Sequence, residues 1–497
     1  MFKKFTFALL TALLSLMATA QTEAFQDGNF WYRPINDTEA EIVKDPSGTP
    51  YNTIKPDWYK STVTNGNGEF TVVAIGEHAF DGATYWLTNS TGKTHNSTST
   101  FALINLTTLR EFKAYSLTNF DAPIIKNTTN LTNIDPKAFY GNKVRRIFFN
   151  GSDTYDYVNL NDVDYGILTS KDHTKLVAYP GKMPNNGDIN GSIKTTVSLP
   201  ADFITIGAWA FGGNSNLKTI TVKSVTIEEG AFEGSAVQTF NGGNVLETIG
   251  DSAFANCAAL TTVTLPETLA TIGEDAFANS ALTSFTVPVG VTTLGPGFIA
   301  GAKNISEIGV DEGNANFQAI NGCVYTKAMD AAPALKDAEG MTLVAVPYGA
   351  TVLEVADGTT AIGSKAAYNG QLETLSLPAS LETIGENAFM GNHGITTIYC
   401  DAINAPVGAN FEEEVFAAEL VLAEGANIGS YANDPVWSKF ELPEPPVPTG
   451  VIDLNTTVTK AQSVYTVDGR LVRQNAISLE GLDAGLYIMG GKKYIVK

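Results

Sequence analysis

Apolar residues along this chain recur in a short phrase of the form Ile-Gly-x-x-Ala-Phe or a close variant of it. Seven clear copies begin at Ile75, Ile134, Ile206, Ile227, Ile249, Ile272 and Ile384. From Ile206 onward the steps between copies are 21, 22 and 23 residues, with a further 22 to Leu294. A fixed period in the low twenties is typical of a solenoid, in which each repeat packs on its neighbours. The pattern therefore predicts a β-rich repeat array of short strands with a period of 22–23 residues.

A second element lies between these phrases, and it alternates polar and apolar residues. In the segment 262–265, Thr-Val-Thr-Leu, the alternation has period two, which predicts a short half-buried strand that Pro266 ends. A further extended piece then leads into Ile-Gly, where we expect glycine to adopt a positive φ at a tight corner. The Ala-Phe pair is expected on the far side of the coil, with alanine where coils approach and phenylalanine in the interior.

Small hydrogen-bonding residues occupy one fixed position, three residues after the phenylalanine of each phrase. They are Asn142, Asn214, Ser235, Cys257, Ser280 and Asn392. Such side chains at one register predict an interior ladder that satisfies loop amides from coil to coil. Cys257 is then either a reactive thiol or one more member of the ladder, and the ladder is favoured because a buried free cysteine behaves as a small apolar residue. With three cysteines in the chain, we expect no disulfide.

The pattern resembles the BspA-like leucine-rich repeats, whose consensus is close to LxxIxLPxxVxxIGxxAFxxC. The resemblance spans roughly residues 70–440 and implies a leucine-rich-repeat solenoid over residues 75–440. Two stretches, at about 165–200 and 317–350, break the period, and both contain Leu-Val-Ala, one residue and proline. We interpret them as β-hairpin repeats inserted in the solenoid, as this family often has. Residues 21–74 are expected to form an N-terminal cap, and the Thr/Asn-rich segment 81–133 has no assignment.

Composition and charge narrow the range of partners. The chain has 497 residues, of which 44% are hydrophobic and 17% are charged, as in a folded protein rather than a disordered one. Its net charge of −21 repels nucleic acid and anionic lipid surfaces, so neither is expected as a partner. Four histidines leave little material for a His-rich metal site.

Residues 1–20 have the pattern of an export signal peptide. Lys3 and Lys4 precede an apolar run over residues 5–17, and Ala-Thr-Ala at 18–20 is a small-residue cleavage pattern. The run is too short for a membrane span, and no other stretch is long and apolar enough to be one. We therefore expect an exported chain with no transmembrane segment.

The C-terminal residues differ from the repeats in charge and in pattern. Residues 21–449 carry a net charge of −25, whereas residues 450–497 carry +2. A proline-rich linker at 441–449 precedes alternating segments with turn signals at Asp468-Gly469 and Gly490-Gly491. These signals predict a small all-β module over residues 450–497.

The module resembles the C-terminal sorting domain of the type IX secretion system. The matching residues are Val464, Tyr465, Gly469, Arg470, Val472, Leu482, Gly485, Tyr487, Lys493, Val496 and Lys497. The resemblance implies passage through this outer-membrane secretion machinery, followed by removal of the tail and attachment to the bacterial cell surface. The alternative is a small structural β-domain, since compact hairpin modules are common.

No stretch of the sequence carries a complete catalytic or metal-binding motif. The segment 92–94, Gly-Lys-Thr, ends like a phosphate loop, but Leu87 stands where its first glycine belongs. The segment 186–191 starts like a calcium loop, but Val197 stands where a bidentate Glu is required. The run 412–414, Glu-Glu-Glu, is interpreted as a solvated face. We therefore expect a non-enzymatic chain with no cofactor and no metal ion.

The residues that flank the central apolar position of each strand are expected to face outward. They are Thr219, Thr221, Thr262, Thr264, Ser284, Thr286, Thr374, Ser376, Thr397 and Tyr399, with Glu307 interrupting them. Threonine favours solvent-facing strands, which explains the pattern without a ligand. The alternatives are a shallow binding face for a glycan or an extended protein, as solenoids provide, and a flat lattice that orders water.

Together these patterns predict a secreted, cell-surface binding protein that acts by adhesion or ligand recognition on a repeat face. The adhesion role is what the BspA-like resemblance implies. The alternative is a structural surface component without a specific ligand. A hydrolase, the third class, needs an acid–base pair that the sequence does not provide.

Overall fold

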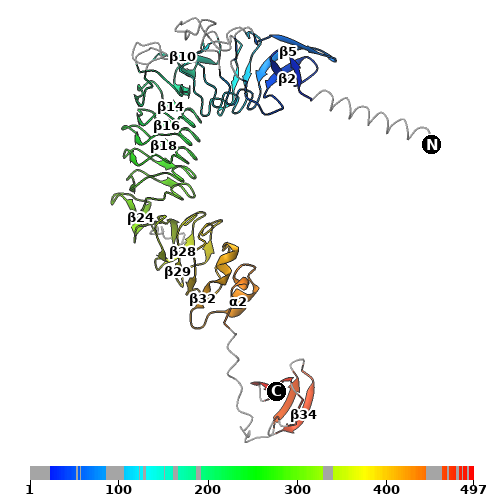
Figure 1. The fold of residues 1–497 in the computed structure, drawn as a ribbon. Coiled ribbons are helices and arrows are strands. Elements are labelled where there is room, and N and C mark those ends of the chain that lie inside the picture. The colour runs from blue at the N-terminus through cyan, green and yellow to red at the C-terminus, as the bar shows by residue number, and fades with distance from the viewer. Residues whose placement is uncertain are drawn as a thin grey trace, which may run out of the picture. The chain divides into compact units, whose positions relative to one another are not determined.

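The computed structural model of this chain describes residues 23–51, 54–55, 58–84, 106–122, 124–126, 130–149, 152–159, 166–185, 192–327, 340–443, 462–466, 469–476, 479, 481–483, 485–489 and 492–496. The chain divides into two compact units, Met1–Ala426 and Asn427–Lys497. The first unit is a β-solenoid (Figure 1), in which equivalent strands begin 22–23 residues apart, at Thr226, Thr248, Thr271 and Thr293. The predicted fold class and period are confirmed.

Each regular coil contributes short parallel strands to two separate sheets. One sheet consists of β13 (Thr196–Ser198), β15 (Thr219–Thr221), β17 (Thr239–Asn241) and β19 (Thr262–Thr264). The other contains β14 (Thr205–Ile206), β16 (Thr226–Ile227), β18 (Thr248–Ile249), β20 (Thr271–Ile272) and β22 (Thr293–Leu294). Neighbouring strands pair in register, so each position of a coil lies beside the same position of the next coil.

The phenylalanine of each phrase fills the interior of the stack. Phe211, Phe232, Phe254 and Phe277 are buried and stack in sequence, with neighbouring ring centroids 4.8, 4.8 and 5.2 Å apart and ring planes 11°, 2° and 5° from parallel. The alanine that precedes Phe254 in the phrase, Ala253, is fully buried as well. The predicted roles of Ala and Phe are confirmed, because only a small side chain fits beside a continuous column of rings.

The glycine that follows the isoleucine of the phrase has a different role from the predicted one. Neither Gly273 nor Gly385 has a positive φ. A Cβ on Gly273 would lie 2.4 Å from Asp251 Oδ1 and 2.6 Å from a backbone carbon of the preceding coil, and one on Gly385 would lie 2.4 Å from the backbone N of Ser364. The expected left-handed corner is therefore wrong. Glycine is required here because the backbones of neighbouring coils approach too closely for a side chain.

Left-handed backbone occurs at two other positions of the coil. One is the residue before Ala-Phe, as in His78, Trp209 and Asp275. The other lies two residues after the phenylalanine position and is filled by Gly213, Gly234, Asn256, Asn279 and Gly301 in the regular coils. This second position holds either glycine or asparagine because both tolerate positive φ better than other residues.

The N-terminal strands form one sheet that runs into the first coils. Its order is β1 (Phe25–Asp27), β2 (Phe30–Pro34), β3 (Glu39–Val43), β5 (Gly68–Ile75), β6 (Glu111–Phe112) and β8 (Asn133–Ile134), with β4 (Thr62–Asn65) paired to β5. From β3 onward the strands on this path are parallel, as in the coils. Strand β5 crosses the predicted boundary between the cap and the solenoid, so the two share one sheet.

Part of the segment 81–133 forms a coil of the solenoid that the sequence did not reveal. Phe112 stands in the position of the phrase's isoleucine, and Ser116 and Leu117 stand in those of Ala-Phe; all three are buried. The coil is fixed to the N-terminal sheet by Lys113, whose Nζ lies 2.8 Å from Oε2 of the buried Glu41 on β3. Beside it, β7 (Ile124–Lys126) pairs with β9 (Arg146–Phe148).

Antiparallel strands interrupt the stack at the two stretches where hairpin repeats are expected. The first holds β10 (Tyr155–Val158), β11 (Ile167–Ser170) and β12 (Lys175–Ala178), and the second holds β24 (Phe317–Ile320), β25 (Cys323–Thr326) and β26 (Met341–Ala345). In each, the last strand rejoins a parallel ladder, β12 with β14 and β26 with β28 (Thr359–Ile362). An antiparallel turn thus replaces a full coil without ending the solenoid.

The remaining strands of the first unit continue the two kinds of ladder. They are β21 (Phe285–Val287), β23 (Ile308–Val310), β27 (Val352–Glu354), β29 (Thr374–Leu377), β30 (Thr383–Ile384), β31 (Thr397–Cys400) and β32 (Glu419–Leu422). The short 3₁₀ helix η2 (Glu413–Ala417) precedes β32. Lys365 connects coils across the second hairpin repeat, because its Nζ lies 2.8 Å from Glu274 Oε1 and 2.6 Å from Asp275 Oδ2.

The second unit contains α2 (Ile428–Asn433), η3 (Trp437–Lys439) and a four-stranded antiparallel sheet. The rings of Tyr431 and Phe440 each lie within 6 Å of the Trp437 ring, at centroid distances of 5.7 and 5.8 Å. The sheet order is β34 (Leu471–Ala476), β33 (Gln462–Thr466), β35 (Gly485–Met489) and β36 (Lys492–Val496). Its small core consists of Val464, Ala476, Leu479, Tyr487 and Met489.

Candidate functional site

The ten residues predicted to face outward all reach solvent. Exposed members are Thr262, Thr264, Ser284, Thr286 and Tyr399, and half-buried members are Thr219, Thr221, Thr374, Ser376 and Thr397. The apolar residues between them, such as Ile220, Leu375 and Ile398, are fully buried. The alternation arises because successive side chains of a strand point to opposite faces of the sheet.

Parallel register gathers four of these residues, with four others, into two polar rows. The first row is Thr196, Thr219, Thr239 and Thr262, and the second is Ser198, Thr221, Asn241 and Thr264. We call these eight residues the hydroxyl face. Thr196, Ser198, Thr239 and Asn241 were missed in the sequence, although Thr-Val-Ser and Thr-Phe-Asn alternate like the predicted strands.

The other predicted residues belong to two further sheets. Ser284 and Thr286 lie at β21, which pairs with β23, while β29 and β31 carry the remaining four in the sheet β27-β29-β31-β32. The ten residues therefore do not form one continuous lattice. A regular water-ordering surface needs such a lattice, which the described strands do not provide.

A cleft of about 330 Å³ opens where the hydroxyl face ends at β19. Thr264 and Glu267 line it from one coil, and Ser284, Thr286 and Asp311 line it from the coils that follow, with Val263, Leu265, Phe285 and Pro288 completing the wall. The ladder is interrupted here, because β19 pairs with β17 and β21 pairs with β23. Hydroxyls and carboxylates beside apolar groups are suited to hydrogen-bond the hydroxyls of a sugar or the amides of a peptide.

The interior ladder predicted after each phenylalanine is present, but its members differ. Asn392 Nδ2 donates to the backbone carbonyls of Ala367 at 2.6 Å and Phe389 at 2.9 Å, and its Oδ1 accepts from Leu372 N at 3.1 Å. Ser280 is buried too, yet its Oγ has no hydrogen-bond partner among the residues that the structure describes. Asparagine spans the gap between coils because its amide both donates and accepts.

Cys257 is a member of this ladder. Its Sγ donates to the carbonyl oxygen of Phe232 at 3.0 Å and lies 3.5 Å from Ser235 Oγ. Burial raises the pKa of Cys257 to about 11, so the thiol stays protonated near neutral pH and is a poor nucleophile. Cys323 and Cys400 are also buried.

A second cleft, of about 580 Å³, lies between coils on either side of the second hairpin repeat. Asn279 and Lys303 line it from the coils before the repeat, Tyr348 lines it from the end of the repeat, and Glu373 and His393 line it from the coils after the repeat. Its wall mixes polar and apolar atoms and contains both signs of charge, on Lys303 and Glu373.

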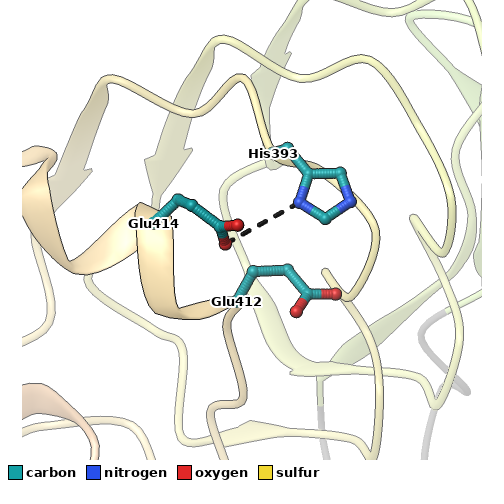
Figure 2. A group of neighbouring side chains, drawn as sticks. All are labelled: His393, Glu412 and Glu414. Atoms are coloured by element: carbon teal, nitrogen blue, oxygen red, sulfur yellow. Dashed lines mark ion pairs between the residues drawn. The ribbon is translucent and has the colours of Figure 1, made fainter.

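Three side chains of types that can bind a metal ion lie close together beside this second cleft (Figure 2). His393 Nδ1 lies 3.8 Å from Glu414 Oε2, and the ligand atoms of His393, Glu412 and Glu414 all lie within 4.8 Å of one another. The sequence reasoning, which assigned the run 412–414 to a solvated face, missed this group. The two glutamates follow His393 by 19 and 21 residues, close to one coil, and that spacing is the signal that points to it.

The predicted sorting residues lie in the sheet of the second unit. Val464 and Tyr487 are buried in its core, and the Tyr487 hydroxyl donates to the Asp483 carbonyl at 3.0 Å. Tyr465, Gly469 and Arg470 are exposed, Gly485 is half-buried, and Lys493 lies on β36. Lys497, the export signal at 1–20, the loops at 92–94 and 186–191, and most of the linker at 441–449 lie outside the described residues. No helix in the described ranges is long and apolar enough to cross a membrane.

Comparison with known proteins identifies the repeats. Residues 190–306 and 350–418 match the BspA type leucine rich repeat region, in six copies. No curated protein matches the chain. The matched family is a repeat family, and no catalytic family is indicated.

Several solved structures are similar at low sequence identity. A leucine rich cell surface protein from Faecalibacterium prausnitzii is 17% identical with a TM-score of 0.35, covering 81% of this chain and 95% of that chain. The pneumococcal vaccine antigen PcpA is 18% identical with a TM-score of 0.34, covering 82% of each chain. A leucine-rich repeat protein from Bacteroides ovatus is 15% identical with a TM-score of 0.35, covering 81% of this chain and 77% of that chain.

Proposed function

The chain carries BspA-type leucine-rich repeats, and on that premise we propose that it is an exported cell-surface protein that binds an extracellular protein or glycan without catalysis. A repeat stack presents equivalent side chains from coil to coil, which suits recognition of an extended ligand. The net charge of −21 disfavours nucleic acid and anionic lipid as that ligand.

The observation that carries this proposal is the cleft at the end of the hydroxyl face. Four strands supply two rows of polar side chains, and the cleft beyond β19 adds the carboxylates of Glu267 and Asp311. Hydroxyl groups donate and accept hydrogen bonds, whereas carboxylates accept them, so the surface complements ligands rich in hydroxyl or amide donors. We therefore place the binding site at Thr262, Thr264 and the cleft.

A binding screen with a matched control tests this placement. Thr262 and Thr264 flank Val263 on β19, and Thr62 and Thr64 flank Val63 on β4 with the same three-residue sequence and exposed threonines. The full chain is screened against arrayed glycans and extracellular-matrix proteins, followed by the double variants Thr262→Lys/Thr264→Lys and Thr62→Lys/Thr64→Lys. We expect saturable binding that falls at least about tenfold in the first variant only, since lysine blocks the face and changes its charge.

Each other result has a definite meaning. Unchanged binding by a folded Thr262→Lys/Thr264→Lys variant places the ligand elsewhere on the solenoid. An equal loss in both double variants indicates a general effect of added charge rather than a site. Absence of binding by the folded chain favours the structural surface component.

We also propose that residues 450–497 are a type IX sorting signal. In support, Val464 and Tyr487 belong to the core of the sheet, while Arg470 is exposed and accessible for recognition. Deletion of residues 450–497 in a bacterium with this machinery is expected to abolish surface display, measured by labelling intact cells. Arg470→Ala should reduce display without unfolding the module, whereas normal display of the deletion variant contradicts the proposal.

A further inference from the structure

We propose that His393, Glu412 and Glu414 form a binding site for a divalent first-row transition metal ion of the zinc class. They are the one group of three such side chains with ligand atoms within mutual reach in the part of the chain that the structure describes. An imidazole nitrogen with two carboxylates suits zinc and its neighbours, whereas calcium and magnesium prefer oxygen ligands alone. The proposal does not rest on the binding function proposed above.

The distances between the three ligand atoms are close to those of a zinc site, so only small side-chain movements are needed to bind the ion. In a zinc site with bonds of about 2.0–2.2 Å, neighbouring donor atoms lie roughly 3.3–3.6 Å apart. His393 Nδ1 and Glu414 Oε2 are already 3.8 Å apart, and no pair of ligand atoms exceeds 4.8 Å. Figure 2 shows Glu414 extending from the start of η2 toward the imidazole. Rotations of the exposed His393 and Glu414 side chains therefore bring the donors around one point beside the half-buried Glu412.

The backbone on both sides of the site is fixed by buried neighbours. His393 follows Asn392, whose side chain makes three hydrogen bonds inside the stack. Glu412 follows Phe411, whose ring stacks on Phe389 at a centroid distance of 5.6 Å. The two segments that carry the ligands therefore belong to adjacent coils held in register, which lowers the cost of ordering the site.

One ligand is also oriented by a hydrogen bond outside the group. Gly391 N, in the same coil as His393, donates to Glu412 Oε1 at 3.1 Å. This bond holds the carboxylate beside the imidazole and leaves Oε2 for the metal. Hydrogen bonds of this kind orient metal ligands and typically change affinity by about 10–100-fold.

Charge and coordination number define what the bound ion would do. Two carboxylates and a neutral imidazole balance the charge of a divalent cation. Three protein ligands leave at least one position of a four-coordinate zinc ion for water or for a carboxylate of a partner. Because His393 also lines the 580 Å³ cleft, the ion would lie at the edge of that cleft.

Calorimetric titration of the full chain with Zn²⁺ tests the site, and the chain itself provides the control. We expect one principal site per chain, weakened at least about tenfold by each of His393→Ala, Glu412→Gln and Glu414→Gln. Glu413→Gln removes the same charge from the exposed residue between the two ligands and should leave the affinity unchanged. Mg²⁺ and Ca²⁺ at the same concentrations should not compete.

Histidine NMR gives a second readout that does not depend on affinity. The chain has four histidines, so selective labelling gives four imidazole signals, and zinc should shift that of His393 alone. Shifts only at His78 or His173, which lie 3.7 and 3.6 Å from aspartates, would instead place zinc at those pairs. The proposal is overturned by that result, by no binding at millimolar zinc, or by Glu413→Gln weakening binding as much as the ligand variants. Circular dichroism of each variant establishes that it is folded.

Discussion

The coils at residues 205–299 and those at residues 75–142 build the same solenoid with different interiors. In the regular coils, the Phe232 and Phe254 rings stack 4.8 Å apart and 2° from parallel. In the N-terminal coils, the Phe80 and Phe120 rings lie 5.6 Å apart and 28° from parallel, and the Phe112 and Phe139 rings meet at 67°. The interior of the solenoid can thus be filled by a column of equivalent rings or by aromatic rings packed at mixed angles.

The difference teaches that the solenoid requires a filled interior and paired strands rather than one phrase. The coil at 106–122 has the larger Phe112 where other coils have isoleucine, and the smaller Leu117 where they have phenylalanine. The exchange keeps the total volume similar, and cores tolerate substitutions that do so. Its strand β6 still pairs with both neighbours.

The largest effect is expected from emptying the ring column. Phe254→Ala should lower the free energy of unfolding by about 3–5 kcal/mol, because the residue is fully buried between two stacked rings. Phe254→Leu should cost less than half as much, since the N-terminal coil already holds leucine at that position. Chemical denaturation measures both, and equal losses would show that the regular coils lack the tolerance of the N-terminal ones.

A smaller loss of stability is expected when a hydrogen-bonding side chain of the interior ladder is removed. Asn142 Nδ2 donates to the carbonyls of Phe139 and Tyr179, and its Oδ1 accepts from the amides of Val144 and Gly181. Asn142→Ala should therefore destabilise the chain by about 2–3 kcal/mol, because buried backbone groups lose their partners. Ser280→Ala in the regular coils should change stability by less than about 0.5 kcal/mol. A reversed order, measured by the same denaturation, would contradict this assignment of the ladder.

Where neighbouring coils approach closely, replacing glycine with alanine is expected to lower the free energy of unfolding by about 1–3 kcal/mol. Gly273→Ala should be destabilising to that extent, because its Cβ would meet Asp251 and the backbone of the preceding coil. Gly66, in the N-terminal turn between β4 and β5, has open space around it and no positive φ, so Gly66→Ala should be neutral or slightly stabilising. Equal thermal stability of the two variants would remove close approach as the reason for glycine.

The smallest effect at neutral pH is expected from the buried thiols. Burial raises the pKa of both Cys257 and Cys323 to about 11, from an ordinary value of 9.0. The two neutral buried thiols contribute their full share to the free energy of unfolding below about pH 9. This share is lost as the pH rises toward 11, because the thiols of the unfolded chain ionise at lower pH than those of the folded chain. Alkylation of the native chain at pH 8 should therefore label neither residue, and labelling before unfolding would contradict their burial.

The sequence predicted the features that depend on repetition. The 22–23-residue period, the strands that end at proline, the buried Ala-Phe pairs and the antiparallel strands at both interruptions all follow from spacing and alternation. The coil at 106–122 was missed because its residues do not match the residue identities of the repeated phrase. Packing requires only a similar total side-chain volume, which Phe112 and Leu117 together provide. The glycine after isoleucine was assigned to the wrong cause, because the distance between coils is a tertiary property that no single coil contains.

The candidate site was less accessible to sequence reasoning. Alternation identified Thr262 and Thr264 as outward-facing, but not the interruption of the ladder after β19 that opens the cleft. The grouping of His393 with Glu412 and Glu414 depends on which coils are adjacent and on side-chain direction. Finding either site requires knowing which residues of neighbouring coils lie side by side.

The in-register ladders also have a mechanical consequence. The hydrogen bonds between neighbouring strands, such as β16, β18 and β20, run along the direction in which coils stack. Tension along that direction loads these bonds one coil after another, so coils are expected to detach in succession rather than all at once. Each detached coil of about 22 residues releases roughly 75 Å of extended chain, which gives a tethered solenoid a large reserve of length under load.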